Sequence, residues 1–202
     1  MRMFKYNEHY TKMVIGITGS FGSGKTTVAK IFERLGARII DADSVGHRVI
    51  EKNDIKNVLI KEFGEEILSK DGKIDRKLLG DIVFSSKEKV LTLNRITHPR
   101  ILDEIAKIIS DSSGEMIVVV APFLIETGII VDKTILVTTE RERIIERLKM
   151  AGWNEKDIKQ RMKFHPADTE RMKNAQIVIN NNGTLSNTEA RLKRILDEIQ
   201  GI

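Results

Sequence analysis

One segment of the sequence combines glycines, a lysine and hydroxyl side chains at the spacing of a phosphate-binding loop. Residues 19–26 read Gly-Ser-Phe-Gly-Ser-Gly-Lys-Thr and match G-x-x-x-x-G-K-[ST] at every fixed position. Glycines let the backbone curl with its N–H groups pointing inward around a phosphate, and the start of a following helix adds a favourable dipole. The motif therefore predicts that the chain binds a nucleoside triphosphate.

The side chains of this loop have separate expected roles. We expect Lys25 to reach the β- and γ-phosphates, the Thr26 hydroxyl to ligate Mg²⁺, and Thr27 to contact the α-phosphate. The remaining expected phosphate-binding positions are Gly22, Ser23 and Gly24. Kinases, ATPase motors, GTPase switches and nucleotide-gated scaffolds share such a loop, so it leaves the fate of the γ-phosphate open.

Two carboxylates, Asp41 and Asp43, follow an expected strand at 37–40. Ligands of open parallel sheets bind beyond the carboxyl ends of the strands, so these groups are expected near the γ-phosphate. One carboxylate would accept the proton of an attacking hydroxyl while the other helps to hold Mg²⁺ through water. The alternative is that one of them is the N-cap of a helix starting near Ser44, and the spacing alone does not decide.

Five short apolar runs, rich in β-branched residues, predict strands that alternate with helical patterns. Parallel strands need crossover connections, so this alternation predicts a parallel sheet with helices on both faces. The expected fold class is α/β, a three-layer α/β/α P-loop NTPase with about five parallel strands. The expected strands are residues 13–18, 37–40, 116–121, 133–138 and 176–179.

Helix signals place the phosphate loop at the start of a helix that runs from Lys25 to the terminator Gly36. Two capping boxes of the form Ser/Thr-x-x-Glu, at 139–142 and 186–189, predict the starts of two later helices.

The long segment 44–111 departs from simple alternation, because it is mostly helical and contains no strand pattern. Gly64, Asp71-Gly72 and His98-Pro99 are expected to interrupt or kink its helices. We expect this segment to be an insertion that builds a substrate wall.

The composition excludes several classes of protein. The 202 residues contain no Cys, which rules out a disulfide scaffold, a thiolate metal site and a Cys nucleophile. The longest apolar runs have about six residues, far short of a membrane span. Residues 1–12 are not followed by the apolar region of a secretory signal, so we expect a cytoplasmic protein without a membrane partner.

The net charge of +5 is spread unevenly along the chain. Residues 1–13 carry a surplus of two positive charges and residues 139–173 a surplus of three, while the remainder balances. With aromatic residues at only 5%, this pattern does not favour a nucleic-acid partner. Most of these charges are expected on solvated helical faces, and the alternative for 139–173 is a local anion-binding lid.

The chain resembles the dephospho-coenzyme A kinase family from residue 13 to its end. The phosphate loop alone would not choose this family, but several further segments stand in the same order at matching separations. The segments that carry the resemblance are 18–27 (TGSFGSGKTT), 35–43 (LGARIIDAD), 63–64 (FG), 71–76 (DGKIDR), 97–99 (THP), 121–126 (APFLIE) and 178–183 (VINNNG).

This resemblance implies a kinase that moves the γ-phosphoryl group of ATP to the ribose 3′-hydroxyl of dephospho-coenzyme A, with Mg²⁺ as cofactor. It implies that Asp43 is the general base and, with Thr26, a magnesium ligand. Arg147 and Arg161 would approach the phosphates from a lid, and Asn182 would lie in a loop on the adenine side. A monomer or weak homo-oligomer is expected.

The resemblance also implies a division of the chain into parts. The expected parts are an N-terminal extension at 1–12, a nucleotide-binding core at 13–43, 112–138 and 174–202, a coenzyme A-binding insertion at 44–111, and a lid at 139–173. Two positions depart from the family pattern: His47, beside Arg48, stands where many members carry Arg, and His165 stands where members often carry Gln.

Three other functions are compatible with parts of the sequence. A kinase acting on a nucleotide or nucleoside would share everything except the acceptor pocket. A nucleotide-dependent switch or scaffold is disfavoured, because the strand at 116–121 ends in Ala-Pro rather than in the acidic residue common in motors and switches. A nucleic-acid binder is the weakest alternative.

Overall fold

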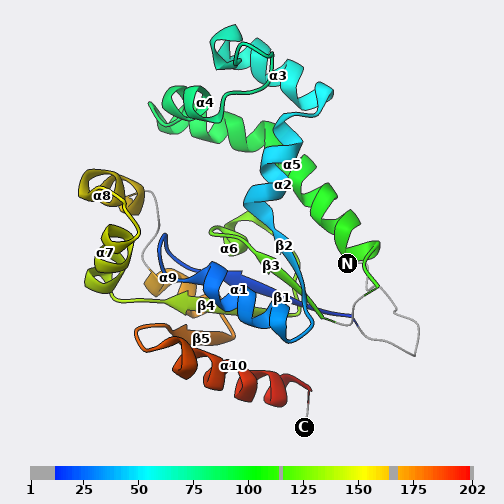
Figure 1. Ribbon diagram of the computed structural model, residues 1–202. Helices are drawn as coiled ribbons and strands as arrows, with labels where there is room; N and C mark the ends of the chain where they lie inside the picture. The colour runs from blue at the N-terminus through cyan, green and yellow to red at the C-terminus, as the bar shows by residue number, and fades with distance from the viewer. Residues whose placement is uncertain (1–11, 114–115, 164–167, 201–202) are drawn as a thin grey trace. The chain divides into compact units, whose positions relative to one another are not determined.

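The computed structural model describes residues 12–113, 116–163 and 168–200 (Figure 1). Within this part of the chain, five strands form one sheet in the order β2-β3-β1-β4-β5. β1 lies between two parallel neighbours, so that Ile15 pairs with Val118 on one side and with Lys133 on the other. The strands are β1 (Met13–Thr18), β2 (Arg38–Asp41), β3 (Met116–Val120), β4 (Lys133–Thr138) and β5 (Ile177–Asn180).

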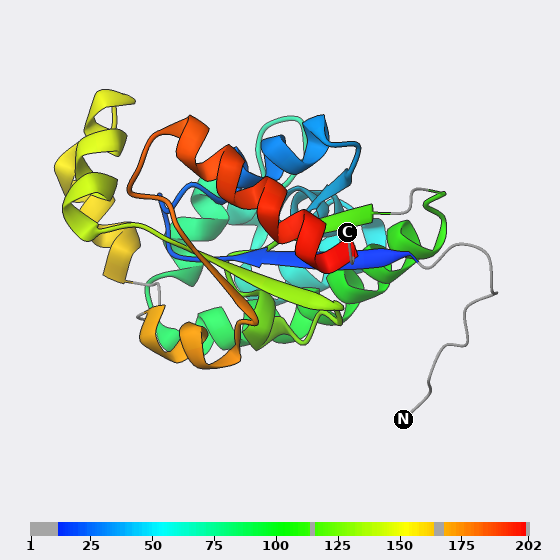
Figure 2. The ribbon, with the colours of Figure 1, turned by 90° about the horizontal axis from the view of Figure 1, so that it is seen from below.

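Helices cover both faces of the sheet, which confirms the three-layer α/β/α fold class. On one face, α1 (Lys25–Arg34) and α10 (Leu185–Gln200) contribute Phe32 and Leu192 to a fully buried cluster with Ile15. On the other face lie α6 (Leu124–Thr127) and α9 (Asp168–Asn174), which contact β1 and β4 respectively. Figure 2 shows α10 and α9 on opposite sides of the sheet.

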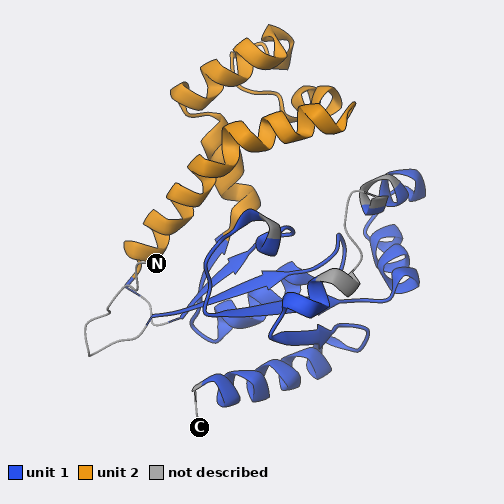
Figure 3. Cartoon of the chain, turned by 180° about the vertical axis from the view of Figure 1, so that it is seen from behind, with its two compact units in different colours: residues 1–40, 113–202 blue, residues 41–112 orange. Residues whose placement is uncertain are grey.

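The chain divides into two compact units, shown in Figure 3. The first comprises residues 1–40 and 113–202 and contains the sheet together with α7 (Arg141–Met150) and α8 (Glu155–Lys163). The second comprises residues 41–112, so the expected insertion at 44–111 lies within it. Its helices are α2 (Ala42–Ile50), α3 (Asn53–Phe63), a 3₁₀ turn (Glu65–Ile67), α4 (Arg76–Val83) and α5 (Lys87–Ser110).

The second unit has a hydrophobic core of its own. Leu59 and Phe63 of α3 pack with Ile67, with Leu79 of α4 and with other apolar residues of the unit. Gly64 ends α3 with a φ of +89°, a conformation that residues with a side chain rarely adopt. No helix in the described ranges combines the length and the apolar character that crossing a bilayer requires.

The helix starts predicted from the two capping boxes were wrong in detail. α7 begins after Glu140 without a side-chain cap, because the Thr139 hydroxyl donates instead to the Ser23 carbonyl at 2.9 Å. α10 begins at Leu185, where the Thr184 hydroxyl accepts from the N–H of Asn187 at 3.3 Å, two residues before the predicted start of the box. In the first case a long-range partner overrides a local pattern.

The dipeptide His98-Pro99 does not end a helix. α5 continues through Pro99 and changes direction along its length (Figure 3). A proline inside a helix lacks the N–H of one backbone hydrogen bond and its ring crowds the preceding turn, so a bend is the usual result. Of the two predicted outcomes, a kink and an interruption, the structure shows the first.

Candidate nucleotide-binding site

The predicted phosphate loop joins the end of β1 to the start of α1. Gly19, Gly22 and Gly24 all have positive φ, at 147°, 77° and 96°. The N–H of Ser23 donates to the Ser20 carbonyl at 3.1 Å and closes a turn over Phe21 and Gly22. Residues with a Cβ atom adopt these backbone angles only at a cost, which explains glycine at these positions.

Close packing adds a second reason for two of these glycines. A Cβ atom at Gly24 would overlap the side-chain amide of Asn181. A Cβ atom at Gly19 would overlap the Val137 carbonyl of β4. The loop therefore lies directly against the ends of neighbouring strands.

The Ser23 carbonyl is held by two side chains from different strands. It accepts the Thr139 hydroxyl, which follows β4, and the Asn181 amide, which follows β5, both at 2.9 Å. Asn181 is 6% exposed, and its own oxygen accepts the Thr188 hydroxyl of α10 at 3.0 Å. Buried hydrogen bonds of this kind fix the loop because breaking one leaves a desolvated polar group.

Lys25 lies over the loop. Its ammonium group donates to the Gly19 and Ser20 carbonyls at 2.9 and 3.0 Å, and the side chain is only partly exposed. Thr26 and Thr27, in the first turn of α1, are exposed. The first turn contains no acidic residue, and no side chain caps the helix.

These features fit a bound polyphosphate. The Ser23 hydroxyl is buried and, among the described residues, makes no hydrogen bond. Together with the uncapped N–H groups at the start of α1 and the ammonium group of Lys25, the loop presents donors on several sides. This donor set matches an anion that carries several oxygens.

The loop after β5 is tied to the start of α7. The Asn182 carboxamide accepts the N–H of Glu140 at 2.8 Å and donates to the Glu140 carboxylate at 2.9 Å. A guanidinium nitrogen of Arg147 lies 3.4 Å from the Gly183 carbonyl. Arg161 belongs to α8, but its side chain, like residue 165, lies outside the described part of the structure.

The two aspartates have different local roles. β2 ends at Asp41, whose carboxylate accepts the N–H of Asp43 at 3.0 Å and the Ser44 hydroxyl at 3.1 Å. Asp41 is therefore the N-cap of α2, which begins at Ala42, two residues before the predicted start near Ser44. Asp43 is an exposed residue of the first helical turn. The chain turns helical between them, so they do not share a strand face.

Farther along α2, His47, which departs from the family pattern, is paired within the second unit. A guanidinium nitrogen of Arg76 lies 2.9 Å from Nδ1 of His47. Arg48 is exposed. Asp43 and His47 belong to the second unit, whereas Lys25, Thr26 and Asn182 belong to the first.

Three residues of the first unit have contacts that the sequence alone did not indicate. Thr139 and Asn181 hold the loop carbonyl, and Arg171 of α9 is 2% exposed with its guanidinium carbon 5.6 Å from the ring centroid of Phe123. The Asn-Asn-Asn run gave a signal for Asn181, but Thr139 and Arg171 are ordinary residues of a polar segment. Only tertiary contacts reveal them.

Comparison with known proteins extends these observations over most of the chain. The family model described as dephospho-CoA kinase matches residues 13–187. A dephospho-CoA kinase from Dehalococcoides mccartyi is 40% identical over 84% of this chain and 88% of its own length. One from Aquifex aeolicus is 38% identical over 92% of this chain and 96% of its own length.

Solved structures show the same relationship. The dephospho-CoA kinase from Campylobacter jejuni superposes with a TM-score of 0.67 and 27% identity, covering 94% of this chain and 98% of its own. The matched range includes the phosphate loop, the Asp41–Asp43 turn and the asparagine run after β5. The chain belongs to the dephospho-CoA kinase family.

Proposed function

We propose that this chain transfers the γ-phosphoryl group of ATP to the ribose 3′-hydroxyl of dephospho-CoA, and that it does so with the residues named below. The observation that carries the proposal is the phosphate loop itself. Its backbone is fixed at Ser23 by hydrogen bonds from two other strand ends, and Lys25 lies over it. Family membership supplies the acceptor.

The first unit would bind ATP. Backbone N–H groups of the loop, among them those of Gly22 and Gly24, would surround the β-phosphate, Lys25 would contact the β- and γ-phosphates, and Thr27 the α-phosphate. Asn182 would lie beside the adenine. Mg²⁺, when bound, would neutralise charge on the phosphate oxygens, and Thr26 and Asp43 are the residues proposed to hold it.

Asp43 is the proposed general base. It would take the proton of the 3′-hydroxyl as that oxygen bonds to the γ-phosphorus, while the bond from phosphorus to the β,γ-bridging oxygen breaks and ADP leaves. Asp41 has a structural role beside it, since its carboxylate accepts two hydrogen bonds as the cap of α2.

Arg147 and Arg161 are proposed to stabilise charge on the transferred group. In related phosphoryl transfers an arginine so placed contributes roughly 10³–10⁵ in rate. The transition state is loose, so positioning and charge neutralisation supply most of the acceleration. A cytoplasmic location and a monomeric or weakly associating state belong to the same proposal.

The decisive test is an assay of ADP formation from ATP and Mg²⁺ with one acceptor at a time. We expect turnover with dephospho-CoA and only background with AMP, with a nucleoside or without acceptor. Mass spectrometry of the product should show one added phosphate on dephospho-CoA. Preferential phosphorylation of a nucleoside monophosphate would assign the chain another acceptor, and acceptor-independent hydrolysis would indicate a switch.

A further inference from the structure

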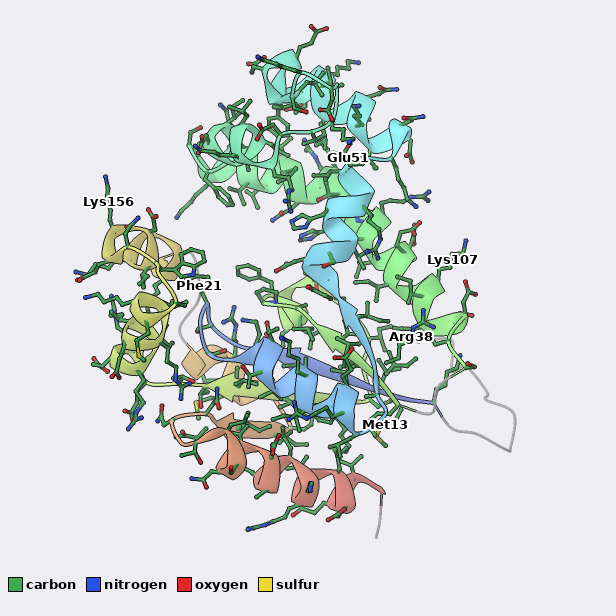
Figure 4. All side chains as sticks on the ribbon, in the orientation of Figure 1. Met13, Phe21, Arg38, Glu51, Lys107 and Lys156 are labelled. Carbon is green, nitrogen blue, oxygen red and sulfur yellow. The ribbon has the colours of Figure 1, made fainter. Side chains whose placement is uncertain are left out.

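An aromatic pair joins the phosphate loop to the segment between α7 and α8. The ring centroids of Phe21 and Trp153 are 5.4 Å apart and the rings are inclined at 69°, an edge-to-face contact. Phe21 lies in the turn that the Ser23 N–H closes, and Trp153 is the single tryptophan of the sequence. Figure 4 labels Phe21 at the side of the sheet where α7 and α8 lie.

The end of α7 fixes the position of Trp153. Gly152 has a φ of +87°, and its N–H donates to the Lys149 carbonyl at 2.9 Å. The N–H of Trp153 donates to the Leu148 carbonyl at 3.0 Å. This pair of bonds is a Schellman motif, which sets the direction of the chain as it leaves a helix. The backbone at Trp153 is therefore fixed by hydrogen bonds, and its ring packs against Phe21.

A second contact lies one residue farther along the loop. A Cβ atom at Gly22 would come within 2.6 Å of the Ile144 side chain and 3.0 Å of Leu148, both on α7. Ile144 is 2% exposed, so this part of α7 is packed rather than solvated. The outer turn of the loop thus meets α7 and its C-terminal cap at two successive residues, Phe21 and Gly22.

We infer that Trp153 is a positioning residue for ATP binding, acting through Phe21 on the backbone of the phosphate loop. The loop binds phosphate with N–H groups whose directions depend on the turn at residues 20–23. Ser20 and Gly22 carry little or no side chain, so Phe21 has the one large side chain of that turn, and its ring contacts Trp153. The inference rests on the proposed function of the loop.

One consequence is a coupling between ATP and the α7–α8 segment. If the aromatic contact favours the phosphate-binding conformation of the loop, bound ATP must favour the contact to the same degree. Aromatic pairs contribute about 0.5–1.5 kcal/mol beyond the burial of their area, which corresponds to about a two- to tenfold change in affinity.

The test is a double-mutant cycle on ATP affinity, measured by displacement of a fluorescent ATP analogue. Phe21→Leu and Trp153→Leu keep an apolar side chain but remove the aromatic ring, and each should weaken ATP binding about two- to tenfold. The double variant should bind no more weakly than the poorer single one, because the lost interaction is shared. Trp153→Phe should restore most of the affinity.

A matched control is Phe84→Leu, an exposed aromatic residue of the second unit, which should leave ATP affinity unchanged. Urea unfolding of the same variants distinguishes a role in ATP binding from a purely structural one. The inference would be overturned if the two substitutions were coupled in the free energy of unfolding but not in ATP affinity, or if their effects on ATP affinity were additive. Wild-type ATP binding without dephospho-CoA phosphorylation would refute the proposed function while leaving this inference intact. Turnover with unchanged affinity in both single variants would refute only the inference.

Discussion

The phosphate loop and the start of α2 both carry residues proposed to act on ATP, but they are built differently. In the loop, backbone groups are proposed to bind phosphate, and three glycines adopt positive φ. Side chains from two other strand ends, the buried Asn181 and the partly buried Thr139, hold one carbonyl. At the start of α2, the proposed base is an exposed side chain on a helix whose cap is the preceding aspartate. Binding is thus assigned to a preformed backbone and proton transfer to one solvated group.

The largest effect is expected for Asp43→Asn, which tests whether proton transfer and ATP binding depend on different residues. We expect kcat to fall by about 10²–10⁴, the usual contribution of a general base, while ATP affinity stays within about twofold. Steady-state kinetics and nucleotide displacement measure the two quantities. Asp41→Asn is the matched control, because asparagine caps helices as well as aspartate does. If Asp41→Asn lost turnover and Asp43→Asn kept it, the roles of the two carboxylates would be reversed.

Lys25→Met tests the contribution of the ammonium group above the loop to turnover. Removing a preorganised donor to a developing negative charge costs about 10²–10³ in kcat, and we expect a loss of that size. Lys30→Met, on an exposed position of the same helix, should have little effect. Equal losses in both variants would point to the helix as a whole rather than to the ammonium group above the loop.

Asn181 and Asn182 allow buried and exposed side-chain hydrogen bonds to be compared in their effect on stability. Asn181→Ala should lower the free energy of unfolding by about 1–3 kcal/mol, because it leaves the buried Ser23 carbonyl and Thr188 hydroxyl with fewer partners. Asn182→Ala, which removes exposed hydrogen bonds to Glu140, should change it by about 0.5 kcal/mol or less. Urea unfolding distinguishes these outcomes, and equal effects would contradict the proposed hierarchy.

The smallest expected effect concerns the pH dependence of the α7–α8 segment. Hydrogen bonds from Lys149 and Lys159 lower the pKa of Glu155 from 4.5 to about 2. A lowered pKa in the folded state means that the stabilisation is complete above pH 4.5 and is lost as the pH falls toward 2. The group is exposed, so the change should be modest and should shrink in high salt.

Glu155→Gln should flatten that part of the pH profile, measured as the urea midpoint between pH 5 and the acid limit of folding. Glu142→Gln, on the exposed face of α7, is the control. A wild-type profile that Glu155→Gln leaves unchanged would show that the ion pairs contribute nothing measurable.

The sequence predicted the backbone of the phosphate loop better than the side-chain contacts that hold it and the start of α2, for a physical reason. Glycine spacing and apolar runs encode φ angles and burial locally, so the loop, β1 and α1 follow from short patterns. The partners of Ser23 lie more than a hundred residues away in the chain, and nothing near Thr139 indicates that its hydroxyl would leave the capping position for the loop. The role of Asp41 as a cap was among the predicted alternatives, but its assignment required the observed end of β2.

The central place of β1 in the sheet protects it from local unfolding of the strands. β2 and β5 are the outer strands, whereas β1 is hydrogen-bonded on both sides, and its residues Ile15 and Ile17 are completely inaccessible to solvent. Local fluctuations that separate an outer strand from the sheet leave both of these ladders intact. The amide hydrogens of β1 should therefore exchange with deuterium more slowly than most others in the protein. The end of β1 that leads into the phosphate loop should stay folded while amides of the edge strands β2 and β5 exchange.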